Sequence, residues 1–210
     1  MRSVNQPQQA RSHASFSKVL STTVSLLAEK GLSGVTIAEV SERASVSVGT
    51  IYGRVGNRSN LLRLVHEREL ARLQVSLESK LQKLQSDGEN SVEGIVAVYV
   101  GEMVANAPII KALIEMSADM SELSDAGPAS WRDSRRSIAL SLSEATDVDP
   151  GKCPKQWTEW LFEIMFATTV HHLERRDLET PATETFAQNL SATIRILMSA
   201  ATPNSPFSAG

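Results

Sequence analysis

Hydroxyl and arginine side chains occur close together between residues 36 and 58 of this sequence. Hydroxyl groups hydrogen-bond to phosphate oxygens, and the guanidinium fork of arginine pairs with phosphate or with the edge of guanine. Chemistry of this kind binds a polyanion and changes no covalent bond, so it requires an element that presents several such groups on one surface. The side chains that could act in this way include Thr36, Ser47, Thr50, Tyr52, Arg54 and Arg58.

The sequence lacks the usual signatures of catalysis. Gly151-Lys152 is followed by Cys153, where a phosphate-binding loop requires Ser or Thr, and Gly31-Leu-Ser-Gly34 has the wrong spacing for a nucleophile elbow. None of the four histidines has a glutamate three residues before it, as a di-iron helical bundle requires. His171 and Glu174 share a helix face and could bind a metal with a third ligand, but a polar helix end is the simpler interpretation. We expect a protein that is not an enzyme and needs no cofactor.

The composition is typical of a globular protein. The 210 residues carry 21 Lys and Arg against 24 Asp and Glu, a formal net charge of −3, and 41% of them are hydrophobic. The single cysteine cannot form an intramolecular disulfide, and no run approaches the roughly 18 apolar residues of a membrane span. The first dozen residues lack the apolar middle of a signal peptide. We therefore expect a cytoplasmic protein that does not enter a membrane.

The charge is unevenly distributed along the chain. Residues 1–65 contain eight basic and three acidic residues, a sum of +5, and the remaining 145 residues contain 13 basic and 21 acidic residues, a sum of −8. A basic head gains free energy by displacing the counterions of a polyanion, whereas an acidic body is repelled by it. The other interpretation is a solvated surface whose asymmetry has no function.

Helical periodicity dominates the sequence, and no segment shows the sustained alternation of a β-hairpin. Apolar residues recur at helical spacing from Phe16 up to Gly31. Thr36 and Glu39 fit a capping box, in which each side chain satisfies the other residue's backbone N–H, so a short helix is predicted over residues 36–44. Ser47 is the predicted N-cap of another short helix that ends near residue 54. This pattern is helix, tight turn, helix.

The rest of the chain predicts six further helices. Asn57 can cap a long helix with a leucine stripe that reaches about residue 85. Breaks rich in Pro, Gly, Ser and Asp separate the later segments, which are expected at about residues 91–106, 109–118, 130–145, 155–175 and 182–199. The expected fold class is all-α.

The sequence TIAEVSERASVSVGTIYGRVGNRSNLL, residues 36–62, resembles the signature of the TetR family of transcriptional regulators. The resemblance covers roughly residues 15–65, including the amphipathic helix that precedes the signature. It implies an N-terminal three-helix DNA-binding domain with a helix-turn-helix, followed by an all-helical domain for effector binding and dimerisation. We therefore expect an arm at 1–12, a helix-turn-helix domain at 13–57, an effector and dimerisation domain at 58–200 and a tail at 201–210.

The same resemblance assigns roles to individual residues. It implies that Thr50 and Tyr52 reach the DNA, that Arg54 lies near the end of the recognition helix, and that Arg58 holds a phosphate. The implied DNA-binding positions are Thr36, Ser47, Val48, Thr50, Tyr52, Arg54 and Arg58. The sequence departs from the family at Val48, where lysine is common, and at Gly53 and Val55, which replace an aromatic pair. A valine at position 48 loses a phosphate contact but can meet a thymine methyl group. Instead of binding DNA, Tyr52 could be an aromatic residue of the core, and the Thr50 hydroxyl could simply cap a helix.

The acidic body is expected to dimerise and to bind an effector. Two segments at about 155–175 and 182–199 have more apolar faces than one protomer covers, which predicts a homodimer with a four-helix interface. The predicted interface residues are Trp157, Trp160, Leu161, Ile164, Thr168, Phe186, Leu190, Ile194, Leu197 and Met198. The residues proposed to line a pocket for a small apolar or amphipathic effector are Tyr99, Met103, Met116, Met120, Trp131, Ile138, Met165 and Phe166. Plain core packing is the alternative for each of the latter set.

The predicted function is therefore a DNA-binding regulator, most simply a repressor that an effector releases from a palindromic operator. An alternative function is also open: the chain could be a helical ligand-binding or scaffolding protein whose basic head binds an acidic protein. Salt dependence of DNA binding separates the two, because only phosphate binding releases condensed counterions.

Overall fold

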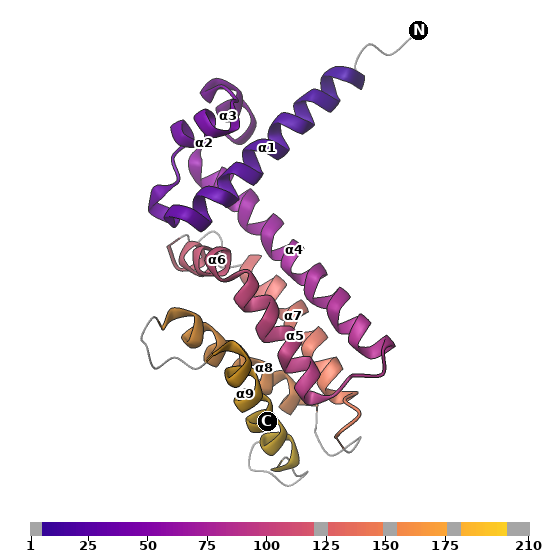
Figure 1. The fold of residues 1–210 in the computed structure, drawn as a ribbon. Helices are drawn as coiled ribbons and strands as arrows, with labels where there is room; N and C mark the ends of the chain where they lie inside the picture. The colour runs from indigo at the N-terminus through magenta and orange to yellow at the C-terminus, as the bar shows by residue number, and fades with distance from the viewer. Residues whose placement is uncertain (1–5, 120–125, 149–154, 176–181, 201–210) are drawn as a thin grey trace. The chain divides into compact units, whose positions relative to one another are not determined.

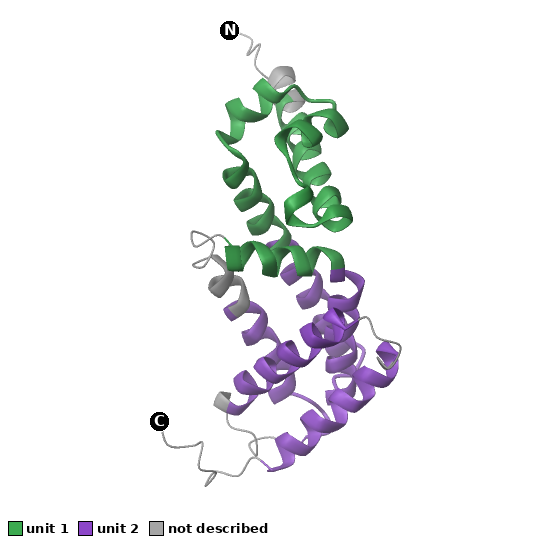
Figure 2. Ribbon diagram, turned by 90° about the vertical axis from the view of Figure 1, so that its left-hand side faces the viewer, with its two compact units in different colours: residues 1–70, 108–127 green, residues 71–107, 128–210 purple. Residues whose placement is uncertain are grey.

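The computed structural model describes residues 6–119, 126–148, 155–175 and 182–200, and Figure 1 shows the fold. Within these ranges the chain forms nine α-helices and one short 3₁₀ turn, with no strand, which confirms the predicted all-α class. The helices divide into two compact units, coloured separately in Figure 2: residues 1–70 with 108–127, and residues 71–107 with 128–210. We call these unit 1 and unit 2.

Unit 1 begins with α1 (Gln6–Lys30), which the 3₁₀ turn η1 (Leu32–Gly34) joins to α2 (Ile37–Ala44) and α3 (Val48–Val55). The first part of α4 (Arg58–Ser86) and most of α6 (Ala107–Asp119) complete it. Its buried apolar side chains include Val19, Leu26, Leu27, Val35, Ile37, Val40, Ala44, Ile51, Val55, Leu61, Leu62, Val65 and Met116. The first segment of unit 1 ends at residue 70, whereas the helix-turn-helix domain was predicted to end at residue 57. The two boundaries differ because the start of α4 packs with the helix-turn-helix.

Local capping chemistry fixes the helix-turn-helix. The Thr36 hydroxyl accepts a hydrogen bond from the Glu39 N–H at 3.1 Å, and the Ser47 hydroxyl accepts one from the Thr50 N–H at 3.2 Å. Between them, Ser45 ends α2 in the left-handed conformation at φ 53°. The Asn57 carboxamide oxygen accepts from the Asn60 N–H at 2.8 Å and caps α4. All three predicted N-caps are thus confirmed.

Two details of the sequence reading are wrong. Helix α1 begins at Gln6, so residues 6–12 are helical where an arm was expected. The reason is compositional: Pro7 needs no helical N–H in the first turn, and the Gln, Ala and Arg residues that follow it have good helix propensity. Helix α7 (Ala126–Ser143) likewise starts about one turn earlier than predicted. Residues 1–5 and the tail at 201–210 lie outside the described residues.

Unit 2 is built from the rest of α4, α5 (Val92–Ala105), most of α7, α8 (Lys155–Glu174) and α9 (Thr183–Ala200). One apolar core joins these helices. Its buried members are Leu77, Leu81, Val92, Ile95, Val96, Tyr99, Val100, Ile138, Leu142, Ala145, Leu161, Phe162, Met165, Leu190, Ile194 and Met198. Helix α5 is apolar on nearly all sides because it lies in the middle of this core and packs extensively against α9.

A polar cluster fastens α4 to the C-terminal end of α5 within unit 2. Lys80 pairs with the buried carboxylate of Glu102, whose other oxygen accepts a hydrogen bond from the Asn106 carboxamide at 3.0 Å. The Asn106 oxygen in turn accepts a hydrogen bond from Arg72 at 2.9 Å. Because a buried carboxylate requires a partner, this cluster fixes how the two helices pack. We call these four residues the α4–α5 clamp.

No single described helix is long and apolar enough to cross a membrane, although α5 and α6 together, as a bent pair, would meet that test.

A buried histidine in unit 1 makes stability depend on pH. The Ser117 hydroxyl donates to the Leu113 carbonyl at 2.9 Å, so His66 Nε2, 2.9 Å from the same hydroxyl, must be the donor of that pair. His66 Nδ1 is buried and has no hydrogen-bond partner among the described residues. Burial therefore lowers the pKa of His66 below its ordinary value.

We expect the unfolded chain to take up a proton at His66 before the folded chain does as the pH falls through about 6.5. Stability from this site is thus complete above that pH and is lost below it. Urea unfolding of the wild-type and His66→Gln proteins between pH 8 and 5 measures this effect, because Gln can keep the donor and cannot titrate. The wild-type curve should fall more steeply on acidification, and parallel curves would contradict the expectation.

Candidate nucleic-acid interface

Helix α3 presents one face to the core of unit 1 and the opposite face to solvent. Ile51 and Val55 are buried, whereas Val48 is 41% exposed and Tyr52 is 47% exposed. At about 100° per residue, Gly49 and Gly53 lie at the middle of the exposed face. A Cβ placed on either glycine would meet nothing within 4 Å. This face therefore offers side chains on both of its edges and bare backbone between them.

The Ser47 and Thr50 hydroxyls lie 2.8 Å apart and form a hydrogen bond at the start of α3. Both residues are exposed. The Ser47 oxygen also caps the helix, so the pair has a structural role in the folded chain. The Thr50 hydroxyl is thus bound to the capping residue Ser47 and does not itself cap the helix.

Arg54, on the edge of α3 next to α1, is held by that helix. Its guanidinium donates a hydrogen bond to the Ser12 hydroxyl and lies 4.9 Å from the centre of the Phe16 ring. These contacts position a cation beside the exposed face without a carboxylate to neutralise it. They were missed by sequence reasoning, because the partner residues are about 40 positions away and no local pattern links them.

The guanidinium of Arg58 binds backbone carbonyls of the same chain. It is half-buried, and its Nε and Nη2 atoms donate to the carbonyl oxygens of Val35 and Leu32, each at 2.6 Å. The side chain thus joins the start of α4 to η1 and to Val35, the residue that follows η1. In the folded chain Arg58 is a structural tie, because the Val35 carbonyl lies outside a helix and needs a donor. The phosphate contact that the resemblance implies for Arg58 stays a prediction.

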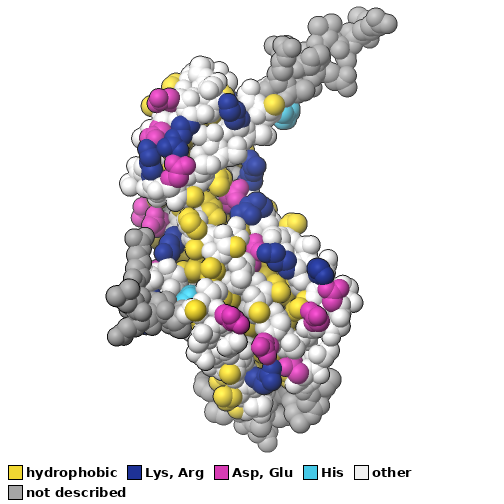
Figure 3. All heavy atoms as spheres, viewed as in Figure 1, with side chains coloured by type: hydrophobic (Ala, Val, Ile, Leu, Met, Phe, Trp, Pro, Cys, Tyr) yellow, Lys and Arg dark blue, Asp and Glu magenta, His cyan; other side chains and the backbone are white. Residues whose placement is uncertain are grey.

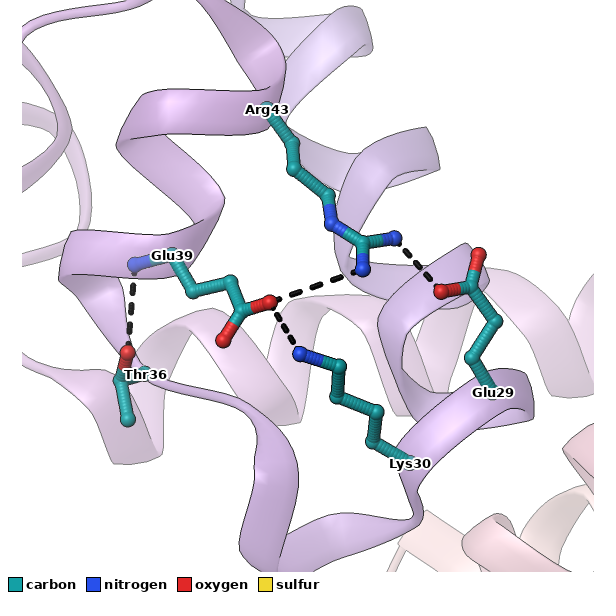
Figure 4. Close-up of polar contacts among 5 residues, drawn as sticks. All are labelled: Glu29, Lys30, Thr36, Glu39 and Arg43. Carbon is teal, nitrogen blue, oxygen red and sulfur yellow. Dashed lines mark hydrogen bonds and ion pairs between the residues drawn. The ribbon is translucent and has the colours of Figure 1, made fainter.

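An ion-pair network at the junction of α1 and α2 pairs two cations of the basic head with carboxylates (Figure 4). The Glu39 carboxylate pairs with Lys30 and, at 3.5 Å, with Arg43, which also pairs with Glu29 at 2.6 Å. Only half of the predicted capping box is present: the Thr36 hydroxyl caps α2, but the Glu39 side chain turns to these cations. Hydrogen bonding to Lys30 lowers the pKa of Glu39.

A further cation of residues 1–65 is paired within α4. Arg63 pairs with Glu67 at 2.7 Å, in addition to the network of Figure 4. Positive and negative side chains also lie next to one another on the face shown in Figure 3. Among the described side chains of residues 12–65, Lys18, Arg54 and Arg58 are the cations without a carboxylate partner. These three are therefore the described cations of this segment that could contact a polyanion.

The residues proposed to line an effector pocket do not form one group. Met116 is buried in unit 1, whereas Tyr99, Ile138 and Met165 belong to the buried core of unit 2, with Met103 and Phe166 packed against it. The side chains of Met120 and Trp131 lie outside the described residues. Core packing accounts for all six described positions, so the pocket remains a proposal.

Several residues of the predicted dimer interface are inside the protomer. Leu161, Leu190, Ile194 and Met198 are buried in the core of unit 2, and this part of the prediction is corrected. Each of these side chains is at most 5% exposed within one protomer, so a second chain would add little burial to them. The members that keep exposed surface are Trp157, Trp160, Ile164, Thr168, Phe186 and Leu197. Sequence reasoning missed Ile196, which is 66% exposed on α9.

No group of three or more His, Cys, Asp or Glu side chains in the described ranges is arranged to hold a metal ion. The fold and the exposed face of α3 instead define a helix-turn-helix protein with a second helical unit. Residues 19–65 match the model of the family described as bacterial regulatory proteins, tetR family. This match confirms, for the N-terminal domain, the resemblance seen in the sequence.

Solved structures agree with this assignment at the level of the fold. A putative TetR-family regulator from Mesorhizobium loti superposes with a TM-score of 0.73 at 14% identity, covering 90% of this chain and 97% of that one. A putative transcriptional regulator from Streptomyces coelicolor gives 0.64 at 19%, covering 86% and 97%. One from Pseudomonas aeruginosa gives 0.66 at 14%, covering 93% of both chains. No curated protein matches the sequence.

Proposed function

We propose that this chain is a sequence-specific DNA-binding regulator that acts as a homodimer on a palindromic operator and represses transcription until a small molecule releases it. The observation that carries the proposal is the exposed face of α3 on a TetR-type helix-turn-helix. A helix of this kind places its N-terminal residues against base edges in the major groove. Ser47, Val48, Thr50 and Tyr52 are exposed on or next to that part of α3.

The proposed phosphate contacts come from the cations that no carboxylate neutralises. Lys18 is exposed on α1, and Arg54 is held beside α3 by Ser12 and Phe16. Arg58 adds positive charge at the start of α4, even though its guanidinium is partly occupied by carbonyl oxygens. A dimer would therefore bring about six such cations to the DNA.

The experiment that tests DNA binding is a salt titration on duplex DNA. With about six phosphates neutralised, the logarithm of the association constant should fall with the logarithm of salt concentration at a slope near −5. Lys18→Ala should reduce the magnitude of that slope by about two in the dimer, one for each protomer. A flat salt response would contradict the proposal and favour a scaffold whose head binds an acidic protein.

The effector part of the proposal rests on hydroxyl groups in unit 2 that lack partners. The Tyr99 hydroxyl and the Thr169 hydroxyl are buried and have no hydrogen-bond partner among the described residues. Burial raises the pKa of Tyr99, so its phenol stays protonated and can donate. Such orphaned groups inside an apolar core suit a mostly apolar ligand that supplies an acceptor.

Dimerisation is expected through the exposed parts of α8 and α9. Trp160 is 48% exposed and stacks edge-on against Trp157, with ring centres 5.3 Å apart. Together with Ile164, Thr168 and Ile196, these residues leave apolar surface on both helices. A second copy of the chain would cover this surface and space two α3 helices for two half-sites.

Ile196→Glu should convert the dimer to a monomer, since it would bury a charge in the proposed interface. Val75→Glu is a matched control, because Val75 on α4 is 65% exposed and Ile196 on α9 is 66% exposed. Sedimentation velocity at a concentration where the wild-type protein is dimeric should show a monomer only for Ile196→Glu. Dimers for both variants would contradict the proposed interface.

A further inference from the structure

Helix α3 exposes two large apolar side chains on the same edge of its free face. Val48 and Tyr52 are the large hydrophobic residues of unit 1 that are classed as exposed within the described ranges. They are four residues apart, so their side chains are neighbours on the helix surface. Core packing does not account for them, because Ile51 and Val55 fill the buried side of the helix.

The side chains that read bases by paired hydrogen bonds are absent from the outer part of α3. Arginine and lysine pair with guanine, and asparagine and glutamine pair with adenine. Residues 47–53 contain none of these four types. The nearest arginine, Arg54, is held by Ser12 and Phe16 of α1, and the Thr50 hydroxyl is hydrogen-bonded to Ser47.

Apolar side chains of a helix in the major groove can distinguish bases by one apolar group, a methyl group. Thymine alone among the four DNA bases carries a methyl group there, at C5. The space beside Val48 and Tyr52 is open, because Gly49 and Gly53 add no side chain to the middle of the face. The helix can therefore bring both apolar side chains against the floor of the groove without interference from its own residues.

We propose that Val48 and Tyr52 determine operator preference by packing against thymine methyl groups. This inference rests on the proposed DNA-binding function and specifies what part of the operator α3 reads. Burial of a methyl group against Val48 or Tyr52 provides discrimination by apolar contact rather than by hydrogen bonds. Val48 and Tyr52, which are neighbours on the surface of α3, then favour half-sites with thymines on the DNA strand that they face.

The test uses the full-length protein and the best DNA sequence recovered by selection from random duplexes. Each thymine in a half-site is replaced singly by uracil, which removes the methyl group and keeps every hydrogen-bonding atom. We expect affinity to fall about fourfold at one or two positions, the value for losing one buried methyl-sized group. At the remaining positions the substitution should have no effect.

Val48→Ser should abolish the thymine-to-uracil difference at one of these positions. Lys18→Ala is the matched control, since loss of a cation should weaken binding to thymine and uracil duplexes equally. If uracil binds as well as thymine at every position of a selected operator, the inference is overturned while DNA binding itself stands. If selection recovers no preferred sequence, the proposed function fails as well.

Discussion

Lys80→Met is expected to lower the free energy of unfolding by about 2–4 kcal/mol, more than most single substitutions on a protein surface. The Lys80 side chain is half exposed, but its partner Glu102 is only 7% exposed. Methionine would leave that carboxylate buried with the Asn106 carboxamide as its remaining partner in the α4–α5 clamp. Urea denaturation followed by circular dichroism measures the loss.

Glu102→Gln is the matched control, because it deletes the same ion pair and strands no buried charge. We expect a loss of about 1 kcal/mol for this variant, since glutamine can keep the contact with Asn106. The double variant Lys80→Met/Glu102→Gln should be more stable than Lys80→Met alone. Equal losses for the two single variants would show that the exposed lysine, and not the buried carboxylate, dominates the clamp.

Arg58→Ala should lower the stability of unit 1 by about 2–4 kcal/mol and weaken DNA binding as a consequence. The substitution removes two charge-assisted hydrogen bonds, and it leaves the Leu32 carbonyl with only the long bond from the Val35 N–H, 3.4 Å. Lysine should restore little, because a single ammonium cannot donate from two fixed directions to both carbonyls. Thermal unfolding and DNA affinity are measured on the same preparations.

These two readouts distinguish a structural tie from a phosphate contact. A residue that only binds phosphate would lose DNA affinity and keep its melting temperature. For Arg58→Ala we expect the melting temperature to fall by several degrees at the same time. An unchanged melting temperature with reduced affinity would contradict the tie and return Arg58 to the role that the sequence resemblance implied.

Features set by neighbouring residues were predictable from the sequence. The caps at Thr36, Ser47 and Asn57 depend on bonds to a backbone N–H three residues away, and the helix bounds follow from them. The exposure of Tyr52 follows from the 3.6-residue period once Ile51 is placed inside, because the next residue is rotated by about 100°. Short-range geometry of this kind needs no knowledge of the rest of the fold.

Features set by distant partners were not predictable. Glu39 was assigned to a local capping box, but Lys30 and Arg43 compete for its carboxylate because α1 and α2 pack together. The apolar stripe of α9 was assigned to a dimer, yet Leu190 and Ile194 cover α5 in the same chain. Periodicity shows that a face must be buried and does not show which surface buries it.

The most direct test of the account is selection of bound sequences from random duplex DNA by the full-length protein. We expect an inverted repeat whose half-site centres lie about one helical turn, roughly 34 Å, or a multiple of it apart. We also expect that Tyr52→Ala changes the selected sequence, while Lys18→Ala leaves the sequence unchanged and weakens binding. Recovery of no enriched sequence, or of the same sequence with Tyr52→Ala, would contradict the claim that α3 reads DNA.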